Sequence, residues 1–464
     1  MKYISTRGKA PKLDFSGVLF SGLARDGGLY LPSSWPKFST GEIKEFSGKS
    51  YEEMAFNVIK PFLGDVFSDD ELMKVIIDAY AGFRCSVRCP LSEVQENLYQ
   101  LELFHGPTFA FKDFAMQLVA RMFDCLLKKY DKRITMLAAT SGDTGAAAVE
   151  AFKGIESVDL FVLYPEGRIS KVQQRQMTCA NKKNIHALSV KGNFDDCQLI
   201  VKTLFADLPF RDRVNLSGVN SINWARILAQ VVYYFSAYSQ IQSVSSRIKF
   251  CVPTGNFGNI FAGYVAKKMG LPIDKLIVAT NQNDILYRIV SKGVYLKEEV
   301  SATMSPSMDI QVSSNFERLV FELYHRSSQT VSELMESLKC KGNYSLSQEA
   351  FNNLKSSFAA GRSSEKETIK TISEIFDSQK MLICPHTAVG LNVAKKFCKK
   401  TEIPIITFAT AHPAKFPDAV KLASGVLPDI PNKLENIFNK EEHFLSVPNS
   451  VKSVKHIIEE RIKL

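Results

Sequence analysis

A single lysine, Lys112, stands among three phenylalanines in residues 105–115 (His-Gly-Pro-Thr-Phe-Ala-Phe-Lys-Asp-Phe-Ala). A lysine in such apolar surroundings is partly desolvated, which disfavours its ammonium form and leaves a neutral amine available. A neutral amine held in a pocket can form a Schiff base with an aldehyde cofactor such as pyridoxal phosphate. The alternative is an ordinary lysine whose stem packs on aromatic rings while its ammonium reaches water. The segment alone leaves both interpretations open.

A glycine-rich loop, Thr-Gly-Asn-Phe-Gly-Asn at residues 254–259, lies between a predicted strand and a predicted helix. Glycines allow close backbone approach, and successive N–H groups at a helix N-terminus can hold a phosphate dianion. The candidate phosphate ligands are Gly255, Asn256, Phe257, Gly258 and Asn259. The loop lacks the spacing of a dinucleotide fingerprint and the lysine of a nucleotide-triphosphate loop. The alternative is a turn in which the asparagines only cap the helix.

Small polar residues follow other predicted strands: Ser141 and Thr144, Asn193, and Thr410. Side chains of these types can bind a carboxylate or phosphate at a helix N-terminus, and a hydroxyl at residue 410 could meet a ring nitrogen. Ser141 can instead be an ordinary cap of the helix that follows it. His386, in a further turn, could be a ligand or a structural hydrogen-bonding residue.

Apolar runs alternate with helical patterns from residue 98 onward, which predicts parallel sheets covered by helices. The predicted strands are residues 134–139, 158–164, 185–190, 248–252, 275–279, 381–384 and 403–408. In open sheets of this kind, ligands bind at the carboxyl ends of the strands, where the candidate loops lie. Residues 1–90 are predicted to be mainly helical, with amphipathic helices at 51–63 and 71–83. We expect an α/β lobe at 91–245 that carries Lys112 and a second at 246–464, with a helical insertion near 315–380.

The composition is that of an ordinary globular protein, with 45% hydrophobic residues and a formal net charge of +10. The basic residues are scattered among acidic ones, so the charge does not indicate a nucleic-acid partner, although it suits an anionic substrate. The nine cysteines lack a zinc-ligand spacing and are typical of a reducing compartment. No segment has the pattern of a signal peptide or a membrane span. We therefore expect a cytoplasmic protein without a bound metal.

These segments together resemble the threonine synthase family, which is pyridoxal-phosphate-dependent and has the tryptophan-synthase-β fold (fold type II). The resemblance spans nearly the whole chain in the right order, and three runs carry most of it: residues 105–115, the Thr-Ser-Gly-Asp-Thr-Gly loop at 140–145, and Thr-Ala-His-Pro-Ala-Lys-Phe at 410–416. It implies that Lys112 is the Schiff-base lysine, that residues 255–259 hold the cofactor phosphate and that Thr410 lies at the pyridine nitrogen.

The family resemblance also implies a reaction, the conversion of O-phospho-L-homoserine and water to L-threonine and phosphate, and a protein that is a monomer or a homodimer. The candidate ligands for the substrate are Ser141, Thr144, Asn193, Arg226, His386 and Lys415. One departure from the family is Cys384, where an aspartate is expected. Two alternatives remain open: a related phospholyase or dehydratase that gives 2-oxobutanoate, and a non-catalytic basic protein that has kept the fold.

Overall fold

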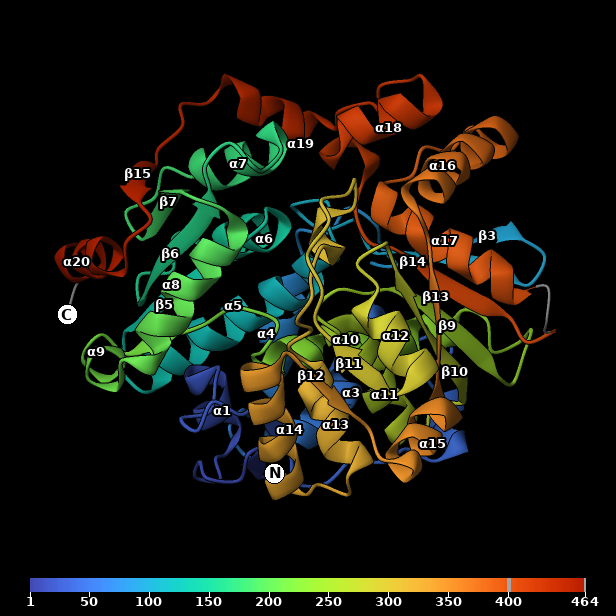
Figure 1. The fold of residues 1–464 in the computed structure, drawn as a ribbon, viewed down its shortest axis with the longest axis horizontal. Coiled ribbons are helices and arrows are strands. Elements are labelled where there is room, and N and C mark those ends of the chain that lie inside the picture. Colours follow the sequence, from blue (N-terminus) through green and yellow to red (C-terminus); the bar gives the residue numbers. More distant parts are fainter. Residues whose placement is uncertain (399–401, 463–464) are drawn as a thin grey trace.

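Two sheets flanked by helices form two lobes that lie side by side in the computed structural model, which describes residues 1–398 and 402–462 (Figure 1). The first sheet is parallel throughout, and its strand order is β15 (Leu445–Pro448), β7 (Ile185–Lys191), β6 (Val158–Pro165), β5 (Ile134–Ala139) and β8 (Leu216–Ser217). The second sheet has the order β13 (Phe358–Arg362), β10 (Ile273–Thr280), β9 (Ile248–Pro253), β14 (Ile405–Ala409), β4 (Leu98–Glu102) and β3 (Leu91–Gln95). Only its β3–β4 pair is antiparallel. The predicted α/β fold class with parallel-rich sheets is confirmed.

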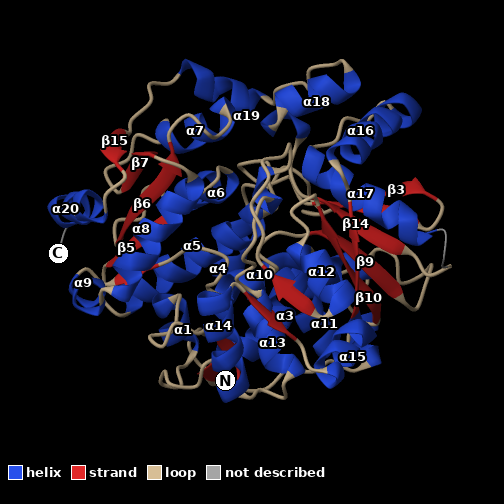
Figure 2. Cartoon of the chain, viewed as in Figure 1, coloured by secondary structure: helices blue, strands red, loops and turns tan. Residues whose placement is uncertain are grey.

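Helices cover both sheets (Figure 2). The helices of the first lobe are α5 (Lys112–Lys129), α6 (Asp143–Phe152), α7 (Lys171–Thr178), α8 (Phe194–Ala206), α9 (Leu208–Arg213) and α20 (Val451–Arg461). Those of the second lobe are α11 (Gly258–Lys268), α12 (Ile285–Lys292), α16 (Glu365–Gln379), α17 (Pro385–Cys398), α18 (Pro417–Ser424) and α19 (Asn432–Glu435). Between the lobes runs α10 (Trp224–Ser239), which is buried from Trp224 to Tyr238 and packs on α5 and α11. Its all-round burial explains its almost wholly apolar sequence.

The N-terminal region is mainly helical, as predicted. It contains the antiparallel pair β1 (Tyr3–Ser5) and β2 (Tyr30–Pro32) and the helices α1 (Phe15–Ser21), α2 (Thr40–Lys44), α3 (Tyr51–Leu63) and α4 (Asp69–Tyr80). Both amphipathic helices begin with a capping box, in which Ser50 pairs with Glu53 and Ser68 pairs with Glu71. The buried faces of α3 and α4 pack against α10 and α5, so this region supports the helices that reach the centre of the molecule.

The sheets do not follow the linear division predicted at residues 91–245 and 246–464. The hairpin β3–β4 precedes Lys112 in the chain but pairs with β14 in the second lobe, and β15 crosses back to pair with β7 in the first. Each crossing gives a strand edge its backbone partners. Such pairing between distant segments leaves no trace in local sequence patterns.

The insertion near residues 315–380 is helical in large part, and it also contributes a strand to a sheet. It contains α13 (Phe316–Leu323), α14 (Ser328–Lys341), α15 (Gln348–Ser357) and the strand β12 (Asn343–Ser345), which pairs with β11 (Val294–Leu296) from outside the insertion. Its strand β13 extends the main sheet beside β10. Short 3-10 turns complete the chain at Pro306–Met308, Pro413–Lys415 and Asn436–Asn439.

The prediction of a strand at residues 381–384 is wrong: the segment is an irregular, partly buried link between α16 and α17. In the sheet, β14 already has β9 on one side and β4 on the other, so no position beside it is free for a further strand. The apolar run is buried by contact with the core, not by strand pairing.

Candidate active site

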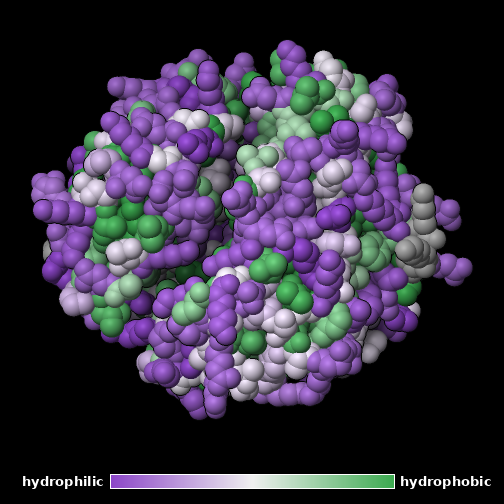
Figure 3. Space-filling view, in the orientation of Figure 1, coloured by the Kyte–Doolittle hydropathy of each residue, from purple (hydrophilic) through white to green (hydrophobic). Residues whose placement is uncertain are grey.

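A pocket of about 290 Å³ lies between the two lobes and is lined by both of them. The space-filling surface is hollowed along the boundary between the lobes (Figure 3). The loops that follow β5, β9 and β14 all reach the pocket, contributing Thr140 and Ser141, residues 254–259, and Thr410. The expectation that ligand loops gather at the carboxyl ends of parallel strands is therefore confirmed.

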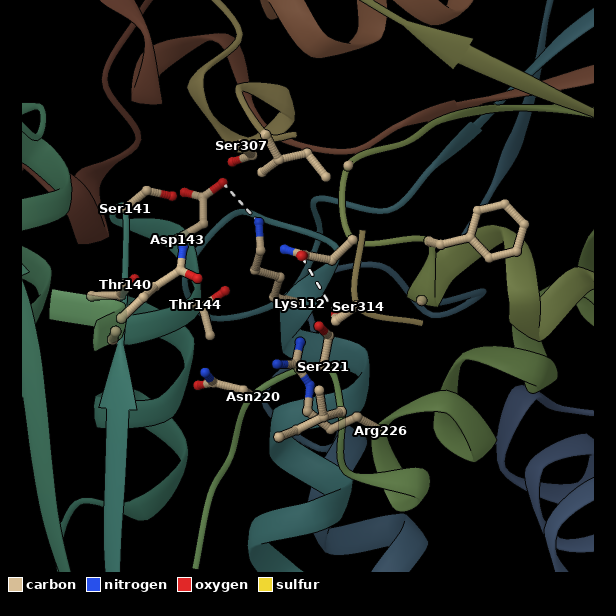
Figure 4. Close-up of a pocket in the computed structure, with 18 of the residues that line it drawn as sticks. Lys112, Thr140, Ser141, Asp143, Thr144, Asn220, Ser221, Arg226, Ser307 and Ser314 are labelled. Atoms are coloured by element: carbon tan, nitrogen blue, oxygen red, sulfur yellow. Dashed lines mark hydrogen bonds and ion pairs between the residues drawn. The ribbon is translucent and has the colours of Figure 1, made fainter. Parts of the chain in front are cut away.

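Lys112 begins α5 and points into this pocket (Figure 4). Its side chain is 11% exposed, and its Nζ lies 4.8 Å from the centre of the Phe111 ring and 3.4 Å from Oδ2 of Asp143. Burial lowers the pKa of Lys112 below its usual value, while the carboxylate of Asp143 opposes that shift. The surroundings thus favour the reactive amine over the interpretation of Lys112 as a surface lysine.

Asp143 is a pocket residue that the sequence analysis did not single out. Besides Lys112, it accepts hydrogen bonds from Nζ of Lys415 at 2.8 Å and from Nε2 of Gln173 at 2.9 Å. Burial alone would raise the pKa of Asp143, but the ammonium groups of Lys415 and Lys112 outweigh burial and hold it well below its usual range. A carboxylate at the first residue of a helix, between the hydroxyls of Ser141 and Thr144, was the signal in the sequence.

The glycine-rich loop forms a cup at the N-terminus of α11. Phe257 adopts a left-handed conformation with φ of 61°, and α11 begins directly after it. The carbonyl oxygen of Gly255 accepts a hydrogen bond from Oγ of Ser313 at 2.7 Å, and that of Asn256 accepts one from Nδ2 of Asn315 at 2.9 Å. Because N–H and C=O of a trans peptide point in opposite directions, the N–H groups that follow point away from Ser313 and Asn315. A Cβ on Gly255 would lie 2.5 Å from the carbonyl oxygen of Ser307, so this position requires glycine.

Asn259, on the first turn of α11, offers the pocket an unused donor. Its Oδ1 accepts a hydrogen bond from the hydroxyl of Tyr233 at 2.6 Å, and its carbonyl oxygen accepts one from Tyr234 at 2.8 Å. Its Nδ2 is buried and donates to no acceptor among the described residues. The first N–H groups of a helix also lack partners within the helix. This set of donors fits a phosphate dianion such as that of pyridoxal phosphate.

Of the six candidate substrate ligands, Ser141, Thr144, Arg226 and His386 line the pocket. Asn193 and Lys415 lie outside the lining. Asn193 is exposed, and its Oδ1 accepts the N–H of Asp196 at 3.0 Å, so it caps α8 and does not face the pocket. The structure therefore shows Asn193 as a helix cap outside the pocket lining, and its role as a substrate ligand stays a prediction. Lys415 is fully buried behind Asp143.

Arg226 is a buried cation on the pocket wall. Its Nη1 donates to the carbonyl oxygen of Val219 at 3.0 Å, while its Nε is buried without an acceptor among the described residues. Burial lowers the pKa of Arg226 to about 10, so the guanidinium remains charged at neutral pH. Asn220 and Ser221 lie beside it in the pocket and were missed in the sequence, although they precede Arg226 closely in the chain (Figure 4). Together these groups could bind a second anion.

His386 joins the pocket wall to the loop above it, because its Nε2 accepts the N–H of Ser307 at 3.2 Å. Burial lowers the pKa of His386 to about 3, so the imidazole is neutral near pH 7. Cys384 occupies the N-cap position of the same helix, α17: its Sγ lies 3.1 Å from Oγ1 of Thr387 and accepts the N–H of that residue at 3.5 Å. The thiol thus fills the capping role that an aspartate would also serve, and burial raises its pKa.

Within residues 1–398 and 402–462, no cluster of three or more His, Cys, Asp or Glu side chains could hold a metal ion. In the same residues, no helix is long and apolar enough to cross a membrane. All nine cysteines are free thiols.

Comparison with known proteins identifies the family. The family model described as threonine synthase N terminus matches residues 2–80, that of pyridoxal-phosphate-dependent enzymes matches residues 88–337, and that of the threonine synthase C-terminal region matches residues 387–458. A threonine synthase from Pseudomonas aeruginosa is 46% identical over 459 residues, which cover 99% of this chain and 98% of the relative.

Two solved structures are similar over their full length. The pyridoxal-phosphate-bound threonine synthase from Brucella melitensis has 50% identity and a TM-score of 0.96, with 100% of each chain covered. Yeast threonine synthase has 39% identity and a TM-score of 0.93, covering 99% of this chain and 98% of the yeast chain. The chain belongs to the threonine synthase family of pyridoxal-phosphate-dependent enzymes.

Proposed function

We propose that the protein converts O-phospho-L-homoserine and water to L-threonine and inorganic phosphate, with pyridoxal phosphate as its cofactor. The observation that carries this proposal is a pocket in which one lysine is accompanied by two separate sets of anion-binding groups. One set is the cup of residues 255–259, and the other surrounds Arg226. A phosphorylated cofactor and a phosphorylated substrate together need two such sets.

Lys112 is proposed to bind the cofactor covalently through Nζ. The partners of the cofactor phosphate would be the N–H groups of the 256–259 turn and Nδ2 of Asn259, and Thr410 would place its hydroxyl at the ring nitrogen. When bound, pyridoxal phosphate supplies an electron sink for bond cleavage at the substrate's carbon atoms. A hydroxyl at the ring nitrogen does not enforce its protonation as a carboxylate would, so the strength of that sink is moderated.

Substrate is proposed to bind with its carboxylate at the N-terminus of α6 and its phosphate at Arg226. Ser141 and Thr144 supply hydroxyls beside the first N–H groups of α6, where an anion is favoured. The buried guanidinium of Arg226 has an unused Nε donor, which suits a charged phosphate oxygen. The amine of Lys112, when free, would move protons at Cα and Cβ of the substrate. His386, neutral at pH 7, would hold Ser307 in place and would not act as an acid.

Location and assembly belong to the same proposal. Nine free thiols suit a reducing compartment, which supports the cytoplasm as the location of the protein. A monomer or a homodimer remains the prediction for the assembly, and sedimentation at several concentrations would distinguish the two.

The proposal is tested by incubating the purified full-length protein, loaded with pyridoxal phosphate, with O-phospho-L-homoserine. The expected result is equimolar L-threonine and phosphate, abolished in the matched variant Lys112→Ala. Formation of 2-oxobutanoate without threonine would instead establish the phospholyase alternative. A protein that acquires no visible chromophore with pyridoxal phosphate and binds polynucleotide in a salt-sensitive way would support the non-catalytic alternative.

A further inference from the structure

At the pocket wall, the side chains of Lys112, Asp143 and Lys415 come from three different segments and meet at the carboxylate of Asp143. Asp143, at the start of α6, is 3.4 Å from Nζ of Lys112 through Oδ2 and 2.8 Å from Nζ of Lys415 through Oδ1. Lys415 ends the 3-10 turn Pro413–Lys415 that follows β14. One carboxylate thus contacts the side-chain nitrogens of two lysines. Lys112 lines the pocket (Figure 4), and Lys415 lies outside the lining.

Lys415 has no route to a ligand. Its side chain is 0% exposed, and its Nζ donates to the carbonyl oxygen of Thr108 at 2.9 Å as well as to Asp143. The loop that contains Thr108 is itself fixed by Asp113, which accepts its N–H at 2.8 Å and its hydroxyl at 2.6 Å. Lys415 therefore acts on the pocket only through Asp143 and through its own positive charge.

Both effects act on the protonation of Lys112. If Asp143 faced Lys112 alone, the carboxylate would stabilise the ammonium form of Lys112, the lysine proposed to bind the cofactor. The ammonium of Lys415 offsets part of the negative charge of Asp143, and it also places a positive charge near Lys112. Both effects oppose protonation of Lys112. Other titratable groups face this cluster. The guanidinium of Arg226 acts on Lys112 in the same direction as Lys415, and the imidazole of His386 faces all three side chains. The carboxyl of Asp113 and the imidazole of His412 face Lys415, and the thiol of Cys384 faces Asp143.

We propose that Lys415 is a positioning residue, which holds the carboxylate of Asp143 beside Lys112 and keeps the amine of Lys112 neutral. This inference rests on the proposed function in one respect: an amine that attacks an aldehyde and accepts a proton from substrate must first be neutral. It replaces the expectation that Lys415 binds substrate. The carboxylate of Asp143 orients Nζ of Lys112. The charge of Lys415 counteracts the tendency of that carboxylate to keep Nζ of Lys112 protonated.

The test measures the pKa of Lys112 directly, without turnover. Full-length apoprotein is labelled with trace acetic anhydride from about pH 6 to about pH 11, and acetylation of the Lys112 peptide is followed by mass spectrometry. In Lys415→Met we expect the midpoint of Lys112 labelling to rise by about 1 pH unit, because a like charge is removed. The matched variant Lys415→Arg retains the charge and should keep the wild-type midpoint. In Asp143→Asn the midpoint should fall, because the attractive charge is lost.

An unchanged midpoint in Lys415→Met would overturn the proposal, as would an equal rise in Lys415→Arg. If circular dichroism shows that Lys415→Met is unfolded, Asp143→Asn decides: a midpoint that does not fall overturns the proposal. Labelling is independent of product formation. If the wild-type protein makes no threonine but the midpoint of Lys112 labelling shifts as expected in the Lys415 and Asp143 variants, the proposed function is refuted and this inference stands.

Discussion

The orientation of one amide, that of Asn259, should control how tightly the protein holds its cofactor. The hydroxyl of Tyr233 donates to Oδ1 of Asn259 at 2.6 Å and lies 3.1 Å from Oε1 of Gln230, all in the buried interior. This contact turns Oδ1 toward α10 and leaves Nδ2 as the free donor. In Tyr233→Phe the amide loses the shorter of its two hydroxyl partners and keeps only the hydroxyl of Tyr234, 3.3 Å from Oδ1; a buried hydrogen bond left unmade costs about 1–2 kcal/mol. Affinity for pyridoxal phosphate should therefore fall about 5- to 30-fold.

The assay is a titration of apoprotein with pyridoxal phosphate, followed by the visible absorbance of the bound cofactor, in a double-mutant cycle with Asn259→Ala. Because Tyr233 acts through the amide of Asn259, Tyr233→Phe should cause no further loss of affinity once Asn259→Ala is present. Thermal unfolding of each apoprotein serves as the control for general loss of stability. Additive losses of affinity in the double variant would refute the reasoning, since Tyr233 would then act by another route.

Three further outcomes are expected. In Arg226→Met the KM for O-phospho-L-homoserine should rise about 10- to 100-fold, because a charge-assisted hydrogen bond to the substrate phosphate is lost, while the affinity for pyridoxal phosphate stays unchanged. Steady-state kinetics measures the KM, and an unchanged KM would contradict this prediction. In Asn193→Ala the free energy of unfolding in urea should fall by about 1 kcal/mol, because a helix cap is lost, whereas a change in KM would show that the residue reaches substrate after all. The pKa of His386 is about 3 in the folded protein and about 6.5 in the unfolded chain. Between these two values the imidazole is protonated in the unfolded chain and neutral in the folded protein, so lowering the pH through this range decreases the free energy of unfolding. Relative to His386→Gln, the free energy of unfolding of the wild type should therefore decrease by about 1.4 kcal/mol for each pH unit below about pH 6.5. Urea unfolding of both proteins at about pH 7, 6 and 5 measures this difference. A difference that does not change with pH would refute the conclusion that His386 is neutral in the folded protein.

The sequence predicted the parts of the site that depend on local structure. The loops after β5, β9 and β14 were found because apolar strands end there and small polar residues follow. Parallel strands bring such loops to one edge, so Thr410 and the residues of the 254–259 loop line a common pocket. Lys112 was found because apolar neighbours in sequence are also its neighbours in space, as the contact with Phe111 shows.

What the sequence could not predict depends on contacts between distant segments. The pairing of Asp143 with Lys415 joins α6 to the turn after β14, and nothing in the sequence around either residue indicates that the two side chains meet. Asn193 shows the reverse problem. The same side-chain oxygen can cap a helix or bind a ligand, and only the position of α8 decides that Asn193 caps. The crossing of β3–β4 and β15 between lobes follows from open strand edges, which exist only once the sheets have formed.

Arg226 and Arg318, two of the buried arginines, differ in how far the protein itself satisfies their nitrogen atoms. Every nitrogen of the Arg318 guanidinium has an acceptor within the protein: Nε donates to Tyr30 O, Nη2 to Ile222 O and Nη1 to Oδ1 of Asn315. All three guanidinium nitrogens of Arg318 therefore donate to acceptors within the protein, and the hydrogen bond to Tyr30 joins the N-terminal region to α13. Arg226 is equally buried, yet its Nε has no acceptor among the described residues, and it lies on the pocket wall. Because an unused buried donor costs free energy, the free Nε supports the proposal that Arg226 binds the substrate phosphate.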